Sequence, residues 1–267
     1  MFPITWRTIK DKRLSLIIFT LATVGMLWVY VGMFPGIQKE SQKLTEAFKS
    51  YPEAMMKAFN IESLDFSKLE NFVAMEQYSI IWPLIVIFLL LAFAGTSLAG
   101  EVEKGTVEPL LSRPLSRRNI FFQKYLAGLV VLVGYTGISV FAIWPLAALQ
   151  HIDFQMANFV SVFWLCLLFG WAVYSLGMLC SVWFSERSRV YGIAGGIVLL
   201  MYVLNIIAAL KESMGNLKYL SFFHYYDSTA VLVRGDFDTL AIVVFAGFSI
   251  IVTALAVWRF QKRDVAA

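Results

Sequence analysis

Six uncharged apolar stretches of about 20 residues dominate the pattern of the chain, and polar segments separate them. They cover residues 14–34, 79–99, 126–149, 159–182, 190–209 and 239–258. A helix of this length rises about 30 Å, which is the thickness of the hydrocarbon core of a bilayer. The alternating stretches of about 10 residues that a membrane β-barrel needs do not occur in the sequence. The pattern therefore predicts an all-α membrane protein with six transmembrane helices.

The polar segments predict several smaller elements. Residues 1–13 have the amphipathic spacing of a short cytoplasmic interfacial helix ahead of the first span. Residues 35–78 form a long extracytoplasmic loop, in which apolar residues at helical spacing and a capping-box pair, Ser67 and Glu70, predict a small helical cap. In the second outer segment, we interpret the aromatic residues, including Phe222 and Tyr226, as an interfacial belt.

Composition agrees with a membrane protein. Of the 267 residues, 59% are apolar and 15% are charged, and the mean hydropathy is +0.72. A soluble domain has roughly 45–50% apolar and about 25% charged residues. The spans use about half of the chain, so residues 1–267 are expected to form a single transmembrane domain without a separate catalytic domain.

The basic residues set the expected orientation. Of the 22 Lys and Arg residues, 14 fall in segments on the side that holds both termini, and these segments contain few acidic residues. Segments on the other side mix basic with many acidic residues. The positive-inside rule therefore predicts that both termini lie in the cytoplasm.

Motifs for chemistry are scarce in the sequence. The two histidines have no partner at metal-ligand spacing, and Cys166 and Cys180 lie about 21 Å apart along one helix, too far for a disulfide. No Walker A sequence is present. The predicted spans carry no charged residue, which argues against a proton-driven transporter. We expect no metal and no cofactor on this chain, and an energy source outside the bilayer.

Small residues in the spans predict close helix contacts or dimerisation, because small-xxx-small spacing lets two backbones approach. The pairs are Gly95 with Ala99, and Gly192 with Gly196. Asn205 is the most notable polar residue within a span. We interpret it as a partner in an interhelical hydrogen bond, with contact to a substrate in a translocation pathway as the alternative.

The most distinctive segment is the connection between the second and third spans, residues 100–120. Gly105 is expected to bend the chain just below the membrane, and Thr106 to cap the helix that continues. Two prolines then bracket the apolar pair Leu110 and Leu111. A solvated loop does not need such a pair between rigid turns, so a groove on a partner protein explains it better.

This segment resembles the type-2 permeases of ABC exporters, through the pattern Glu-x-Glu-x-Gly-Thr-x-Glu-x-Leu-Leu-Ser-x-Pro-x-Ser-Arg at residues 101–117. The resemblance covers most of the chain and implies a coupling helix at 101–112 that is seated on an ATPase subunit. The residues that would make or shape this contact are Glu101, Glu103, Gly105, Thr106, Glu108, Leu110 and Leu111, and Pro114 and Arg117 would position the return to the third span. Pro109 stands where many relatives carry a helix-compatible residue, a departure that bears on how far the coupling helix continues.

The resemblance implies a permease subunit that forms half of a translocation pathway in the cell membrane of a bacterium or archaeon. A second permease chain, identical or related, would complete the pathway. Two separate ABC ATP-binding subunits would bind ATP and Mg²⁺, so no enzymatic activity is expected on this chain. The charge-free spans suggest an apolar or amphipathic substrate, such as a peptide antibiotic, a drug or a lipid-like molecule.

Two alternatives from other functional classes stay open. A non-transporting membrane sensor or scaffold would have no ATPase subunit as partner. A membrane-embedded enzyme would need a carboxylate, a histidine or a Ser–Lys pair at membrane depth, and the predicted spans show none.

Overall fold

The computed structural model describes residues 3–49, 65–111 and 115–263, and every regular element in these ranges is helical. Six helical segments are long and apolar enough to cross a membrane: Pro3–Lys39, Leu69–Ser97, Arg117–Leu149, Met156–Trp183, Arg187–Leu210 and Thr239–Lys262. The predicted all-α fold with six transmembrane helices is confirmed. Each segment is longer than its apolar stretch, because the helix continues into the polar residues at the ends of that stretch.

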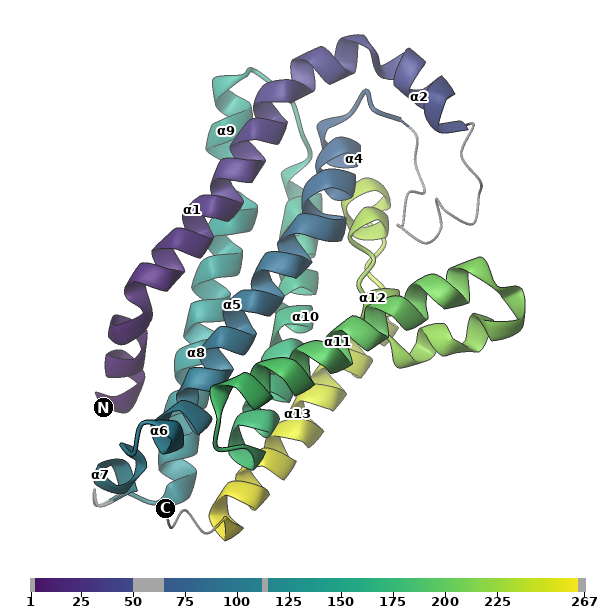
Figure 1. Cartoon of the computed structure of the whole chain (residues 1–267). Coiled ribbons are helices and arrows are strands. Elements are labelled where there is room, and N and C mark those ends of the chain that lie inside the picture. Colours follow the sequence, from purple (N-terminus) through teal and green to yellow (C-terminus); the bar gives the residue numbers. More distant parts are fainter. Residues whose placement is uncertain (1–2, 50–64, 112–114, 264–267) are drawn as a thin grey trace.

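Figure 1 labels these segments and the shorter elements between them. The spans are α1 (Pro3–Lys39), α4 (Leu69–Val73) with the π-helix η1 (Ala74–Ile81) and α5 (Trp82–Ser97), α8 (Arg117–Phe141) with α9 (Ile143–Leu149), α10 (Met156–Trp183), α11 (Arg187–Leu210) and α13 (Thr239–Lys262). The shorter elements are α2 (Ser41–Lys49), α6 (Ala99–Glu103), α7 (Val107–Leu111), η2 (Glu212–Leu220), α12 (Phe222–Tyr225) and η3 (Ala230–Arg234).

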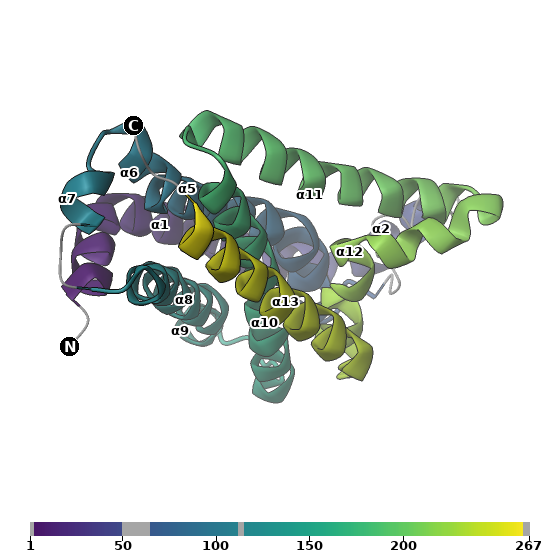
Figure 2. The ribbon, with the colours of Figure 1, turned by 90° about the horizontal axis from the view of Figure 1, so that it is seen from below.

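Helix α10 forms the centre of the bundle and packs against α5, α8, α11 and α13 (Figure 2). Glycines make close approaches between these helices possible, as two examples show. A Cβ at Gly177 of α10 would lie 2.8 Å from the Cβ of Ala94 in α5, and a Cβ at Gly128 of α8 would lie 2.1 Å from Cζ of Tyr174. These contacts are too short for any side chain, so glycine sets the spacing between the central helices.

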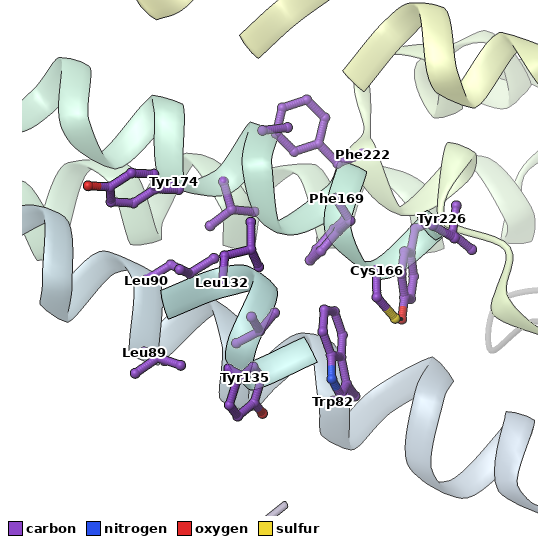
Figure 3. Close-up of a cluster of buried hydrophobic side chains, with 14 of the residues drawn as sticks. Trp82, Leu89, Leu90, Leu132, Tyr135, Cys166, Phe169, Tyr174, Phe222 and Tyr226 are labelled. Carbon is purple, nitrogen blue, oxygen red and sulfur yellow. The ribbon is translucent and has the colours of Figure 1, made fainter. Parts of the chain in front are cut away.

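The core next to α10 is aromatic (Figure 3). The rings of Trp82 and Tyr226 stack at 6.3 Å, and the Phe169 ring lies 4.7 Å from Tyr226. Phe222 packs against Phe245 of α13 at 5.7 Å. The predicted interfacial belt is therefore wrong for Phe222 and Tyr226, because the segment that carries them folds back into the bundle and buries both side chains.

Helix α1 runs without a break from Pro3 to Lys39, so the residues predicted as a separate interfacial helix are its first turns. No Gly or Pro occurs between residues 4 and 24 to interrupt the helix. The first turn is fixed to α8, where the Ile4 N–H donates to Oε1 of Gln123 (3.1 Å) and the Thr5 hydroxyl donates to the Gln123 carbonyl (2.8 Å). The interfacial location of these turns stays a prediction.

Only the two ends of the predicted helical cap at 35–78 are described, because residues 50–64 lie outside the described ranges. The first end contains the last turn of α1 and α2, and the second contains α4 and the start of η1. The predicted capping box of Ser67 and Glu70 is wrong. The Asp65 carboxylate accepts the Ser67 N–H (3.0 Å), and α4 begins after Lys68 without a side-chain cap. Glu70 instead accepts the backbone N–H of Gln155 (2.7 Å), which ties α4 to the start of α10.

Both ends of the described chain and the α6–α7 connection lie at the same end of the bundle (Figure 1). We call this the basic end, because it gathers Arg7, Lys10, Lys12, Arg13, Lys104, Arg117, Arg118, Lys124, Arg187, Arg189, Arg259, Lys262 and Arg263. That the basic end faces the cytoplasm stays a prediction from the positive-inside rule.

Candidate functional site

The chain turns sharply between α6 and α7, at the residue predicted to bend it. Gly105 has φ +69°, a left-handed conformation that glycine adopts without steric cost. The backbone N–H of Thr106 donates to the Glu101 carbonyl (2.9 Å), and the Thr106 hydroxyl hydrogen-bonds to the Glu101 carboxylate. Thr106 directly precedes α7, so this turn fixes the direction in which α7 leaves the bundle.

Glu101 is held inward by a buried lysine. Oε1 of Glu101 lies 2.7 Å from Nζ of Lys124, which also donates to the carbonyl of Ser97 (2.8 Å). The Lys124 side chain is only 3% exposed, whereas that of Glu101 is 30% exposed. Burial alone would raise the pKa of Glu101, but the Lys124 ammonium and the hydrogen bonds outweigh it, so the pKa lies below its ordinary value.

Sequence reasoning missed the role of Lys124. The residue follows three arginines at the start of the third span, and its sequence position groups it with the basic loop residues that set topology. In the structure it lies inside α8 and is nearly fully buried. A buried ammonium needs a carboxylate partner, and Glu101 is 23 residues away in the chain. Neither periodicity nor spacing could have found this pair.

Glu103 fixes the same turn to another helix. Its Oε2 accepts the backbone N–H of Arg187 (2.7 Å) and the Arg187 Nε–H (3.3 Å). Arg187 is the first residue of α11, and the preceding Glu186 provides no side-chain cap. A distant carboxylate therefore takes the place of a local cap at a helix N-terminus, where the free N–H groups and the helix dipole favour an anion. The two acids of the Glu-x-Glu motif join the α6–α7 turn to α8 and α11.

Helix α7 carries the predicted apolar pair. It is a five-residue helix, Val107–Leu111, and Leu110 and Leu111 form its last two positions. Pro109 does not end it, because a proline in the first turn lacks only an N–H that would have no helical partner there. Glu108 is exposed on this helix, and Pro114 lies outside the described residues.

Arg117 begins α8, as the predicted return to the third span requires, and Ser116 caps this helix by accepting the Asn119 N–H (3.2 Å). Arg117 donates to the backbone carbonyl of Arg263 at the end of α13. The Arg263 guanidinium in turn donates to the Phe184 carbonyl (3.2 Å) and the Ser185 hydroxyl (2.7 Å). These bonds join α8, α13 and the α10–α11 connection, and nothing in the tail sequence distinguishes Arg263 from an ordinary topological charge.

The two small-residue pairs have different surroundings. A Cβ at Gly95 would lie 2.3 Å from Cε1 of Tyr191 in α11, and the buried Ala99 donates its N–H to the Ser181 hydroxyl (3.0 Å). This pair therefore packs within the chain. A Cβ added at Gly192 or at Gly196 of α11 would meet no atom within 4 Å in the described part of the protein. Dimerisation through them stays a prediction.

Asn205 is half-buried in α11, and its side chain has no hydrogen bond to another described residue. The interhelical contact expected of it thus does not form within the described part of one chain. A different polar cluster, which the sequence did not indicate, lies inside the bundle around the π-helix η1. There Gln77 donates to the Thr23 carbonyl (3.4 Å), and Tyr226 donates to the Tyr78 carbonyl (3.1 Å).

This cluster is incompletely paired. Oε1 of Gln77 and the hydroxyl of Tyr78 are buried without a hydrogen-bond partner among the described residues. Single π-helical turns and unpaired buried polar atoms both concentrate at functional sites. The sequence prediction placed Gln77 and Tyr78 in the outer loop, because the apolar stretch begins only after them.

In the described ranges, no group of three or more His, Cys, Asp or Glu side chains could hold a metal ion.

Comparison with known proteins gives one family match. The model of the family described as "ABC-2 family transporter protein" matches residues 6–265, nearly the whole chain. No curated protein matches the chain.

Proposed function

The chain belongs to the ABC-2 family of transporter proteins, and from this premise we propose that it is the permease subunit of an ATP-driven exporter whose ATPase is a separate chain. As a member of this family it is a multi-pass membrane subunit for transport and is not itself catalytic. The proposal adds the coupling to ATP hydrolysis, the partner subunits and the class of substrate.

The proposal rests on the two contacts that fix the α6–α7 turn to the helix bundle. Glu101 binds Lys124 of α8 and Glu103 binds the first residue of α11, so a displacement of α7 is passed to two spans. In this proposal Leu110, Leu111 and Glu108 contact the ATPase, whereas Glu101, Glu103, Gly105 and Thr106 shape the contact from inside. Pro114 and Arg117 position the return to α8.

In this proposal, ATP drives transport by binding to the partner ATPase subunits. Two ATPase subunits, which carry ATP and Mg²⁺, would close on nucleotide and pull α7 with them. ATP can shift the helix bundle between its facing states only by as much as its affinity differs between those states. A second permease chain, as a homodimer or heterodimer, would complete the pathway, and the open Gly192–Gly196 face of α11 is available for such packing.

The proposed substrate is apolar or amphipathic: a peptide antibiotic, a drug or a lipid-like molecule. Between their charged ends, the described spans offer aromatic and aliphatic surface and a few neutral polar atoms, of which Gln77, Tyr78 and Asn205 have unused hydrogen-bonding capacity. A neutral pathway suits such a cargo better than an inorganic ion, which needs charged or closely spaced oxygen ligands. The proposed location is the cell membrane of a bacterium or archaeon, with both termini in the cytoplasm.

The test is a paired substitution in the apolar knob formed by Leu110 and Leu111. Leu110→Glu with Leu111→Glu should leave the permease inserted but abolish copurification of the ATPase subunit, because the charges oppose burial in an apolar groove. The control replaces two exposed leucines that lie away from the basic end, on α9 and η2, Leu149→Glu with Leu220→Glu. Normal ATPase docking and export in the knob variant would refute the coupling role, and a native complex without any ATPase subunit would favour a sensor or scaffold.

A further inference from the structure

A cavity of about 330 Å³ opens at the basic end, between the first turns of α1, the α6–α7 turn and the starts of α8 and α11. Figure 2 views the molecule from this end, with α6 and α7 beside the beginning of α1. Six charged side chains line the cavity: the basic Arg7, Lys104, Lys124 and Arg187, and the acidic Asp11 and Glu101. Their formal charges sum to +2, so the cavity has an excess of cations.

Hydrogen bonds within the protein leave much of this positive charge unused. Lys124 is almost fully buried and donates to Glu101 and Ser97, which occupies two of its three N–H groups. Arg187 uses its backbone N–H and Nε–H on Glu103, and its two terminal NH₂ groups have no partner in the described part of the chain. The ammonium of Lys104 has no hydrogen bond or ion pair with any described residue.

The acids of the cavity do not cancel this charge. Glu101 is already committed to Lys124. Asp11 faces Arg7 at 3.9 Å, and both of these side chains are largely exposed, so their attraction is weak. Cations gathered in one small cavity repel one another, and an anion with several acceptor oxygens would relieve that repulsion while using the free donors of Lys104 and Arg187.

From the cavity, α5 runs toward membrane depth and carries exposed apolar residues. Thr96 of α5 lines the cavity, and Ala92, Phe88 and Leu84 precede Thr96 at intervals of four residues, which places them along one side of the helix. Phe88 is 62% exposed and Leu84 is 50% exposed. An amphiphile whose charged group occupied the cavity could therefore lay its hydrocarbon chains against this side of α5.

We propose that this cavity binds the phosphate headgroup of an anionic lipid, with the acyl chains along the exposed side of α5. Basic pockets between membrane helices recognise anionic headgroups in this way, at the side of the membrane where the positive-inside rule places the basic residues. The bound phosphate would bridge α1 (Arg7), the α6–α7 turn (Lys104) and α11 (Arg187). It would thereby hold the turn that carries α7 against the bundle. This binding depends on the membrane location of the chain and not on its transport activity.

The test measures lipid binding to the full-length chain, purified in a neutral detergent, by native mass spectrometry. Phosphatidylglycerol and phosphatidylcholine with identical acyl chains are the probes. Arg7→Gln with Lys104→Gln removes two donors whose side chains are exposed, so the fold should persist. The matched control, Lys10→Gln with Arg13→Gln, removes the same charge from exposed positions on α1 that do not line the cavity.

Wild type and the control should retain phosphatidylglycerol in preference to phosphatidylcholine. The cavity variant should lose at least about tenfold more phosphatidylglycerol affinity than the control, as expected from removing two cations near an anionic headgroup. Competition with inorganic phosphate separates the two sources of the anion: no displacement at millimolar phosphate supports a lipid occupant, and displacement supports a soluble phosphate bound by the same donors. Equal binding of the two lipids by wild type, or equal losses in the two variants, would overturn the proposal.

Discussion

Removing the Glu101 carboxylate should destabilise the protein more than any other single change in the α6–α7 turn. Glu101→Ala leaves the Lys124 ammonium buried with only the Ser97 carbonyl as a partner. A hydrogen bond to a charged group contributes about 1.5–3 kcal/mol, and loss of one partner of a buried pair can cost about 3–5 kcal/mol. Because Glu101 is 30% exposed, water can replace part of its interaction, and we expect a loss of about 1–2 kcal/mol.

The assay is thermal unfolding of the purified chain in one lipid-free detergent. A loss of this size should lower the unfolding temperature by roughly 3–6 °C. Glu186→Ala is the control, since that carboxylate pairs at the same end of the bundle with Arg189 and both side chains are exposed. Adding Lys124→Met to Glu101→Ala removes the buried ammonium that has lost its carboxylate partner, so the double variant should be more stable than Glu101→Ala alone. If Glu101→Ala unfolds like the control, or if the double variant is the less stable of the two, the buried ion pair is not what holds the turn.

The same pair predicts a pH dependence. The folded-state pKa of Glu101 lies below the ordinary 4.5, mainly because Lys124 opposes the effect of burial. Its stabilisation is therefore fully present above pH 4.5 and is lost as the pH falls through the folded-state pKa. The difference in unfolding temperature between wild type and Glu101→Ala should shrink as the pH falls below this value. A difference that stays constant into the acid range would contradict the assignment.

Two further predictions concern helix packing. Glu103→Ala removes the carboxylate that accepts the Arg187 N–H, so the first turn of α11 should fray. We expect the free energy of unfolding to fall by about 1 kcal/mol and hydrogen exchange to be faster at residues 187–190. Glu186→Ala should leave that turn protected, and similar exchange in both variants would argue against capping by Glu103. Gly177→Ala should lower the free energy of unfolding by about 1–3 kcal/mol, measured by thermal unfolding, since its Cβ would lie 2.8 Å from the Cβ of Ala94. Gly192→Ala has open space and should be near neutral within one chain. A fully stable Gly177→Ala would show that α5 and α10 can separate without cost.

The helix count could be predicted because a bilayer imposes a direct demand on sequence: about 20 apolar residues for each crossing. The ends could not, because they depend on partners that are distant in the chain. Helix α11 begins at Arg187, where Glu103 supplies the cap, and α8 includes the buried Lys124, where Glu101 supplies the counter-charge. The Ser67–Glu70 pair shows the reverse case, in which Asp65 competes locally for Ser67 and the predicted cap does not form.

The same distinction, between local signals and partners distant in the chain, applies to the candidate site. The bend at Gly105 follows from local backbone chemistry, and it is found where the sequence predicts it. The inward contacts of Glu101 and Glu103 follow from the packing of three helices, which a loop sequence does not encode by itself. The cluster at Gln77 escaped prediction for another reason: its residues are neutral and lie beyond the apolar stretch by which the span was recognised.

The central claim, that α7 contacts a separate ATPase, is tested most directly by crosslinking in intact membranes. A cysteine introduced at the exposed Glu108 of α7 should crosslink to a subunit with a Walker A sequence, and Leu220→Cys, exposed on η2 away from the basic end, should not. The two native cysteines are buried and should contribute little background. A Walker-containing subunit that crosslinks equally from both positions, or from position 220 alone, would contradict the account.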